Sequence, residues 1–176
     1  MFSIGAQLNR LYTKDEMKRG SIARPGSIAS SIAPDGSSAD YVVVTLATGQ
    51  TLLNGQAVII SGASGHNAVV GTTNPALTVG GRIGVLVLGT ATATATTVGT
   101  SFAWAQIYGR SRALVASAIS TAGKMMMFGA NGRFTLAVAG SASAMPGGSV
   151  ILVEGTSVAG LATLMLNYPH FHGHPA

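Results

Sequence analysis

The stretch Thr100-Ser101-Phe102-Ala103-Trp104-Ala105-Gln106-Ile107-Tyr108-Gly109 holds the only tryptophan and the densest group of aromatic residues in this 176-residue chain. Large and small side chains alternate along it, which is typical of a β-strand whose successive residues point to opposite faces. One face carries Phe102, Trp104, Gln106 and Tyr108, and the other carries Ala103, Ala105 and Ile107. We expect the bulky face to anchor either a core or a subunit contact, and the small face to let another layer approach closely.

On both sides of this stretch, short runs of β-branched and apolar residues alternate with turn signals. Asn131-Gly132 is a strong hairpin signal between two such runs. The runs cover residues 41–47, 56–61, 67–71, 83–88, 90–97, 112–119, 124–128, 133–139, 149–154 and 161–168. Roughly ten short strands with this spacing predict an all-β fold, an antiparallel β-sandwich or barrel with an extended N-terminal arm.

Residues 1–40 differ in composition from the rest. Thr13 and Glu16 have the spacing of a capping box before a short turn of helix. A Ser-Ile-Ala unit then recurs at Ile22, Ile28 and Ile32, among Gly, Pro and Ser. Such a segment is either a disordered linker or an extended arm that docks its isoleucines on a neighbour. We therefore divide the chain into an N-terminal arm (1–40), a β-domain (41–168) and a histidine-containing tail (169–176).

The chain is poor in charge. Only 9% of its residues are charged, against about 25% in typical soluble proteins. We infer that much of the surface is covered by neighbouring molecules. The net charge of +5 is spread thinly, and beyond Asp40 only Arg110 and Arg112 sit close together. We therefore predict no nucleic-acid site and a mild attraction to an acidic protein surface.

Nothing in the sequence predicts catalysis. Carboxylates beyond the first helical turn form no close pair for acid–base work, and Ser64 near His66 does not match a nucleophile elbow. The chain has no cysteine, so we expect no disulfide and no thiolate metal site. We expect no cofactor. We expect no secretory signal, because residues 1–4 lack a basic n-region and a continuous apolar h-region. We also expect no membrane span, because Gly, Thr, Ser and Asn interrupt every long uncharged stretch.

Three histidines near the C-terminus, His170, His172 and His174, alternate and would share a face in an extended chain. Imidazole is a common ligand of transition metals. Against a metal site, chain termini are commonly frayed. We favour a solvated tail and keep the three histidines as metal-ligand candidates.

The Ala/Thr-rich segment 90–97, the central stretch 102–109 and the run 112–115 together resemble small capsid decoration (cement) proteins of tailed bacteriophages. The Gly/Ala/Thr/Val composition and the polar arm fit the same resemblance, which covers mainly residues 80–140. It implies a β-rich, often trimeric protein on the outside of the phage head that clamps neighbouring major capsid subunits. It implies no catalytic residue.

We therefore expect a virion protein of the capsid exterior, made in the host cytoplasm, that binds the major capsid protein and self-associates as a homotrimer. The expected contact residues are Ile22, Ile28, Ile32, Phe102, Trp104 and Tyr108. The alternative is a trimeric virion spike, head fibre or tail adhesin that contacts the host surface.

Overall fold

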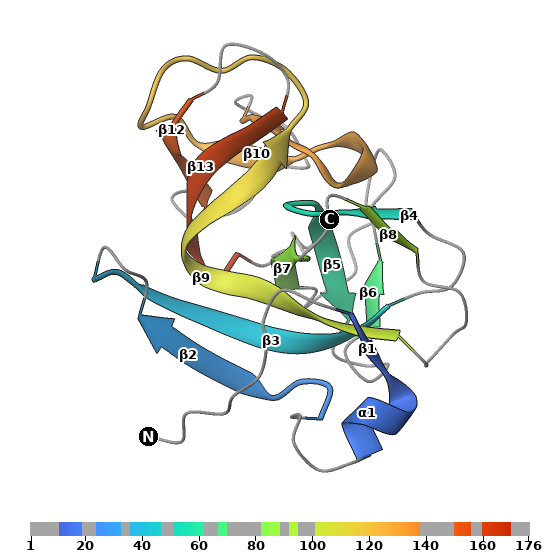
Figure 1. The fold of residues 1–176 in the computed structure, drawn as a ribbon. Coiled ribbons are helices and arrows are strands. Elements are labelled where there is room, and N and C mark those ends of the chain that lie inside the picture. The colour runs from blue at the N-terminus through green and yellow to red at the C-terminus, as the bar shows by residue number, and fades with distance from the viewer. Residues whose placement is uncertain are drawn as a thin grey trace, which may run out of the picture.

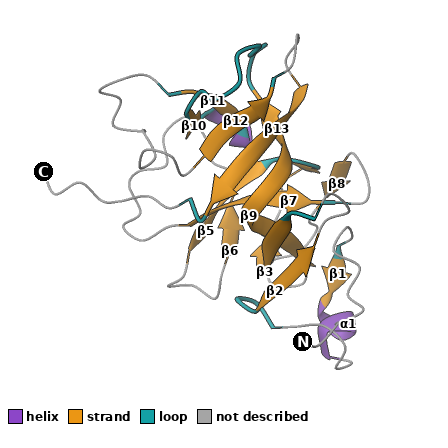
Figure 2. Ribbon diagram, turned by 90° about the vertical axis from the view of Figure 1, so that its left-hand side faces the viewer, coloured by secondary structure: helices purple, strands orange, loops and turns teal. Residues whose placement is uncertain are grey.

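The fold was obtained as a computed structural model. It describes residues 11–18, 24–32, 36–46, 51–61, 67–69, 82–88, 92–94, 101–137, 150–155 and 160–169. The elements in these ranges are β1 (Tyr12–Thr13), α1 (Lys14–Lys18), β2 (Ile28–Ile32), β3 (Ser38–Leu46), β4 (Thr51–Leu53), β5 (Ala57–Ser61), β6 (Asn67–Val69), β7 (Arg82–Val87), β8 (Thr92–Thr94), β9 (Ser101–Val115), β10 (Met126–Phe128), η2 (Ala130–Gly132), β11 (Phe134–Leu136), β12 (Val150–Glu154) and β13 (Gly160–Asn167). The prediction of an all-β fold with mainly antiparallel strands is confirmed (Figures 1 and 2).

Strand β9 is longer than predicted and connects the two halves of the molecule. Its first half pairs with β3 and β7, and its second half pairs with β13, all antiparallel. Gly109 lies inside the strand at φ +90°, just after the ladder with β3 shifts by one residue between Gln106 and Tyr108. The predicted end at Gly109 and the separate strand over 112–119 are therefore wrong, because this irregularity bends β9 without ending it. The curved ribbon of β9 is visible in Figure 1.

Five strands close a ring. The pairings run from β9 to β7, β5, β6 and β3 and return from β3 to β9, with only the β6–β3 step parallel. Alternate residues of these strands fill the interior with a buried cluster: Val42, Val44, Leu46, Val58, Ile60, Leu86, Ala103, Ala105 and Ile107. The small face of the central stretch therefore lines this interior. A Cβ on Gly84 would lie 2.8 Å from that of Ala105, so the strands approach closely there.

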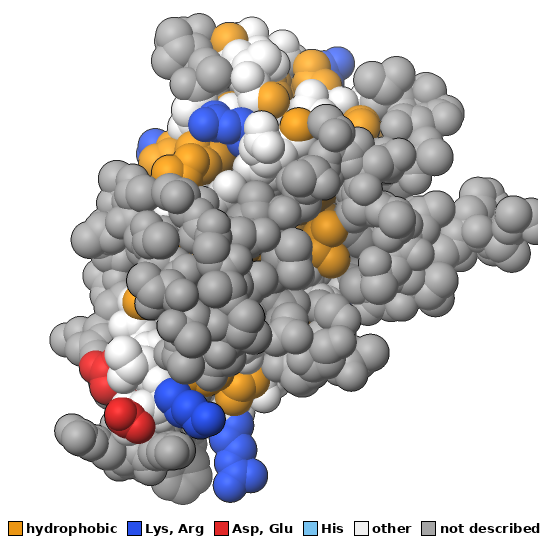
Figure 3. All heavy atoms as spheres, turned by 90° about the vertical axis from the view of Figure 1, so that its right-hand side faces the viewer, with side chains coloured by type: hydrophobic (Ala, Val, Ile, Leu, Met, Phe, Trp, Pro, Cys, Tyr) orange, Lys and Arg blue, Asp and Glu red, His pale blue; other side chains and the backbone are white. Residues whose placement is uncertain are grey.

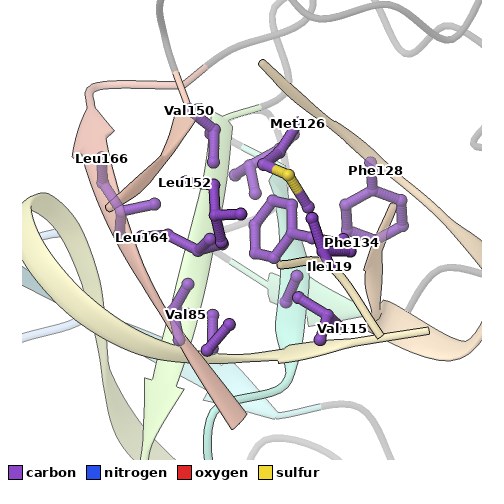
Figure 4. Packing of buried hydrophobic residues seen from close by; sticks show 14 residues of the cluster. Val85, Val115, Ile119, Met126, Phe128, Phe134, Val150, Leu152, Leu164 and Leu166 are labelled. Atoms are coloured by element: carbon purple, nitrogen blue, oxygen red, sulfur yellow. The ribbon is translucent and has the colours of Figure 1, made fainter. Parts of the chain in front are cut away.

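A second core lies between the ring and the hairpin of β12 and β13. Figure 4 shows Leu164 and Leu166 of β13 pointing at the same cluster as Phe134 and Met126. Buried Gln56 ties this part to the ring, because its Nε2 donates to the carbonyl of Asn131 and its Oε1 accepts from the amide of Leu53, both at 2.9 Å.

Parts of the expected arm belong to the sheet. Tyr12 of β1 lies opposite Phe102 of β9 and packs in a third cluster with Val43 and Trp104. Strand β2 pairs with β3 along its whole length and is the last strand of the sheet. The expected boundary at residue 40 therefore falls inside β3. The capping box is confirmed: the amide of Glu16 donates to Thr13 Oγ1, and the amide of Thr13 donates to a Glu16 carboxylate oxygen.

Candidate interaction surface

The outer side of β2 exposes an apolar stripe. Ile28, Ser30 and Ile32 alternate along the strand and share one face, which we call the β2 face. Ile28 is 54% exposed and Ile32 is 70% exposed. On the opposite side of the strand, Ala29 packs against the third cluster, so β2 is held in place while its isoleucines point away from the core.

The same residues form the outer edge of β2, with which no described strand pairs. The amide of Val43 donates to the carbonyl of Ser27 at 3.1 Å. Hydrogen-bonded pairs alternate in an antiparallel ladder, so the N–H and C=O groups of the β2 face point away from β3. An approaching strand would meet these groups and the two isoleucines together.

A pair of stacked tyrosines borders the β2 face. The rings of Tyr108 and Tyr168 lie 5.0 Å apart at 22°, and the hydroxyl of Tyr168 donates a hydrogen bond to the carboxylate of Asp40. In the strand register Asp40 lies opposite Ser30 on one side and Tyr108 on the other. Asp40 thus connects the β2 face to the tyrosine pair.

Two buried features hold this tyrosine pair. Nε2 of buried Gln106 donates to the carbonyls of Tyr108 and Arg110, at 2.9 and 2.7 Å, and so satisfies the backbone around the irregularity in β9. The amide of Tyr168 donates to the carbonyl of Ile107 at 3.0 Å, which ties the end of β13 to the same place. Asp40 and Tyr168 were not among the predicted contact residues, because no local sequence pattern indicates that they lie in this surface.

The pKa of Tyr168 is raised above its ordinary value of 10.0, first by the hydrogen bond to Asp40, then by burial and by the charge of Asp40. A raised pKa means that the stabilisation by this hydrogen bond is complete below the ordinary pKa and is lost as the pH rises through the raised one. We expect the stability difference between wild type and Tyr168→Phe to be present at about pH 8 and to narrow at about pH 11. Urea unfolding at both pH values checks this; a constant difference would contradict it.

The other predicted contact residues lie in different places. Phe102 and Trp104 are buried, Trp104 with 0% exposure. Of the two roles expected for the bulky face, a core or a subunit contact, these two residues therefore have the first. Tyr108 is only half-buried. Ile22, Ser64, His66, His170, His172 and His174 lie outside the described residues.

Two other features are absent from the described part of the chain. No three His, Asp or Glu residues in it lie close enough together to hold a metal ion. Within the same ranges, no helix has the length and apolar character of a membrane span.

No protein-family model matches the sequence, and a search of curated proteins finds no match.

Proposed function

We propose that this chain is a structural virion protein, a capsid decoration (cement) protein that binds the outside of a phage head. The observation that carries the proposal is the β2 face, where Ile28 and Ile32 are exposed on the last strand of the sheet. Its partner is the major capsid protein, and the chain acts as a homotrimer. The low charge content supports a surface that is largely covered by neighbours.

The mechanism is burial of apolar surface combined with strand pairing. Each exposed isoleucine removes apolar area from water when it docks, at about 25 cal/mol per Å² before the costs of association. Strand addition along β2 would pair the backbone groups that point away from β3 with an extended segment of the shell protein. Each contact is weak, but many copies on one shell add their effects through multivalency.

Electron microscopy of virions with and without the chain tests the proposal. Extra density distributed over the head would support a decoration protein. Density only at a projecting tip would overturn it in favour of the spike, head fibre or tail adhesin. Sedimentation of the free chain checks the trimer against the protomer mass of 17.6 kDa.

We expect Ile32→Ser to weaken binding to undecorated heads by about tenfold, because the substitution removes the exposed apolar side chain that docking would bury. Leu136→Ser is the matched control, since Leu136 is also an exposed apolar residue on a strand, β11, away from β2. Co-sedimentation with the heads measures both affinities. Equal affinities for the two variants would count against the β2 face.

A further inference from the structure

The residues of β12 and β13 that face away from the second core are half-buried or exposed. In Figure 4, Val150 and Leu152 of β12 and Leu164 and Leu166 of β13 all point into the cluster. Successive strand residues point to opposite faces. The residues of β12 and β13 that alternate with these four therefore lie on the outer face of the sheet, together with their cross-strand neighbours on β9.

Cross-strand register assembles these outer residues into rows. Arg110 lies opposite Met165, Met165 opposite Ile151, and Ile151 opposite Met125. We call these four residues the outer row. Beside it, Arg112 lies opposite Thr163, whose Oγ1 donates to the Glu154 carboxylate at 3.0 Å.

The outer row has the chemistry of an adaptable contact. Met125 is 52% exposed, and Met165 and Ile151 are half-buried. Methionine is flexible and polarisable, and it is frequent at binding surfaces that adapt to a partner. The exposed side chains of Arg110 and Arg112 form one margin of the row. Among the described residues, Glu154 is the acidic residue of this face, and its carboxylate accepts the hydrogen bond from Thr163.

The acidic side chains are distributed unevenly over the molecule. On the face shown in Figure 3, acidic side chains lie only at the lower end, where Lys and Arg side chains lie beside them, while the upper end shows Lys and Arg among hydrophobic side chains. Beyond Asp40 the chain has five basic residues and Glu154 as its only acidic one. The partner complementary to this face is therefore acidic and partly apolar.

We propose that the outer row, with Arg110 and Arg112 at its margin, docks on an acidic, partly apolar surface of the shell protein. This inference rests on the proposed function and adds a second contact to it. In Figures 1 and 2, β2 lies at the lower end of the molecule and β12 and β13 lie at the upper end. A chain that holds two neighbouring subunits together needs a contact for each, and these two ends provide them.

Two pairs of variants, bound to heads stripped of this protein, test the second contact. Arg112→Glu is paired with Lys14→Glu, which reverses one exposed charge on α1. Met125→Ser is paired with Leu136→Ser, which removes an exposed apolar side chain outside the outer row. Fluorescence of the single buried tryptophan, Trp104, verifies that each variant is folded.

We expect Arg112→Glu and Met125→Ser each to weaken binding about fivefold in low salt, while both controls bind like wild type. The effect of Arg112→Glu shrinks in about 0.5 M salt, because salt screens exposed charges.

If wild type binds and all four variants bind equally, the second contact is overturned and the proposed function stands. If wild type does not bind the heads, both are overturned. If Arg112→Glu instead weakens binding only to random double-stranded DNA, this face is a nucleic-acid contact and the inference is wrong.

Discussion

Replacing Gly109 by alanine is expected to destabilise the protein by about 4 kcal/mol, through backbone strain and overpacking together. Gly109 has φ +90°, a conformation that residues with a Cβ rarely adopt. A Cβ at this position would also lie 2.3 Å from the carbonyl oxygen of Ser38 and 3.1 Å from the Cα of Ala39. Both atoms belong to β3, so relief of the clash requires the two strands to separate where β9 bends.

Gly36→Ala is the matched control for this prediction. Gly36 has a similar φ of +80°, but a Cβ there would meet nothing within 4 Å. Gly36→Ala should therefore lower the free energy of unfolding only by the backbone strain, about 1 kcal/mol. Urea unfolding followed by Trp104 fluorescence measures both variants. Equal losses of unfolding free energy in the two variants would mean that β9 and β3 are not in close contact at Gly109.

Local patterns in the sequence predicted the features that depend on local physics. Alternation from Phe102 to Ile107 gave the correct two faces, because a strand period of two is a property of the backbone. The turn at Asn131-Gly132 was also correct: Asn131 adopts φ 56° and β10 and β11 pair across it, with Phe128 opposite Phe134. Asparagine and glycine tolerate this left-handed conformation at little cost.

Features that depend on distant partners could not be predicted in this way. Gly109 looked like the end of a strand, but β13, which begins only at Gly160, pairs with the second half of β9 and extends the strand beyond this glycine. The sequence of β2 looked like a free arm, because five residues of Ile, Ala and Ser carry no sign of the strand that will pair with them. Only the ladder with β3 decides that this segment joins the sheet.

In the candidate surface, too, some residues could be predicted from local sequence patterns and others depend on distant partners. Ile28 and Ile32 were predicted as contact residues from their spacing alone, and both are exposed on one face. Trp104 was predicted from its size and rarity, and these properties suit a core as well as an interface. Asp40 and Tyr168 lie 128 residues apart, so no pattern within a segment of the sequence indicates that they meet. The outer row likewise depends on register across three strands and one isolated bridge.

The register that defines the outer row can be tested on β13 itself. Leu164 has 0% exposure in the second core, whereas Leu161, three residues earlier on the opposite face, is 36% exposed. We expect Leu164→Ala to destabilise the protein by about 3 kcal/mol, from lost burial and the cavity that remains. Leu161→Ala removes the same atoms from a half-open position and should cost less than about 1 kcal/mol.

Urea unfolding of the two leucine variants gives a direct comparison, because the chemistry of the substitution is identical. A one-residue shift of β13 against β9 would exchange its two faces. Leu161→Ala would then be the more damaging change, and Met165 would move from the outer row into the core. A larger loss for Leu164→Ala therefore supports both the second core and the row of residues on the other side of the same strand.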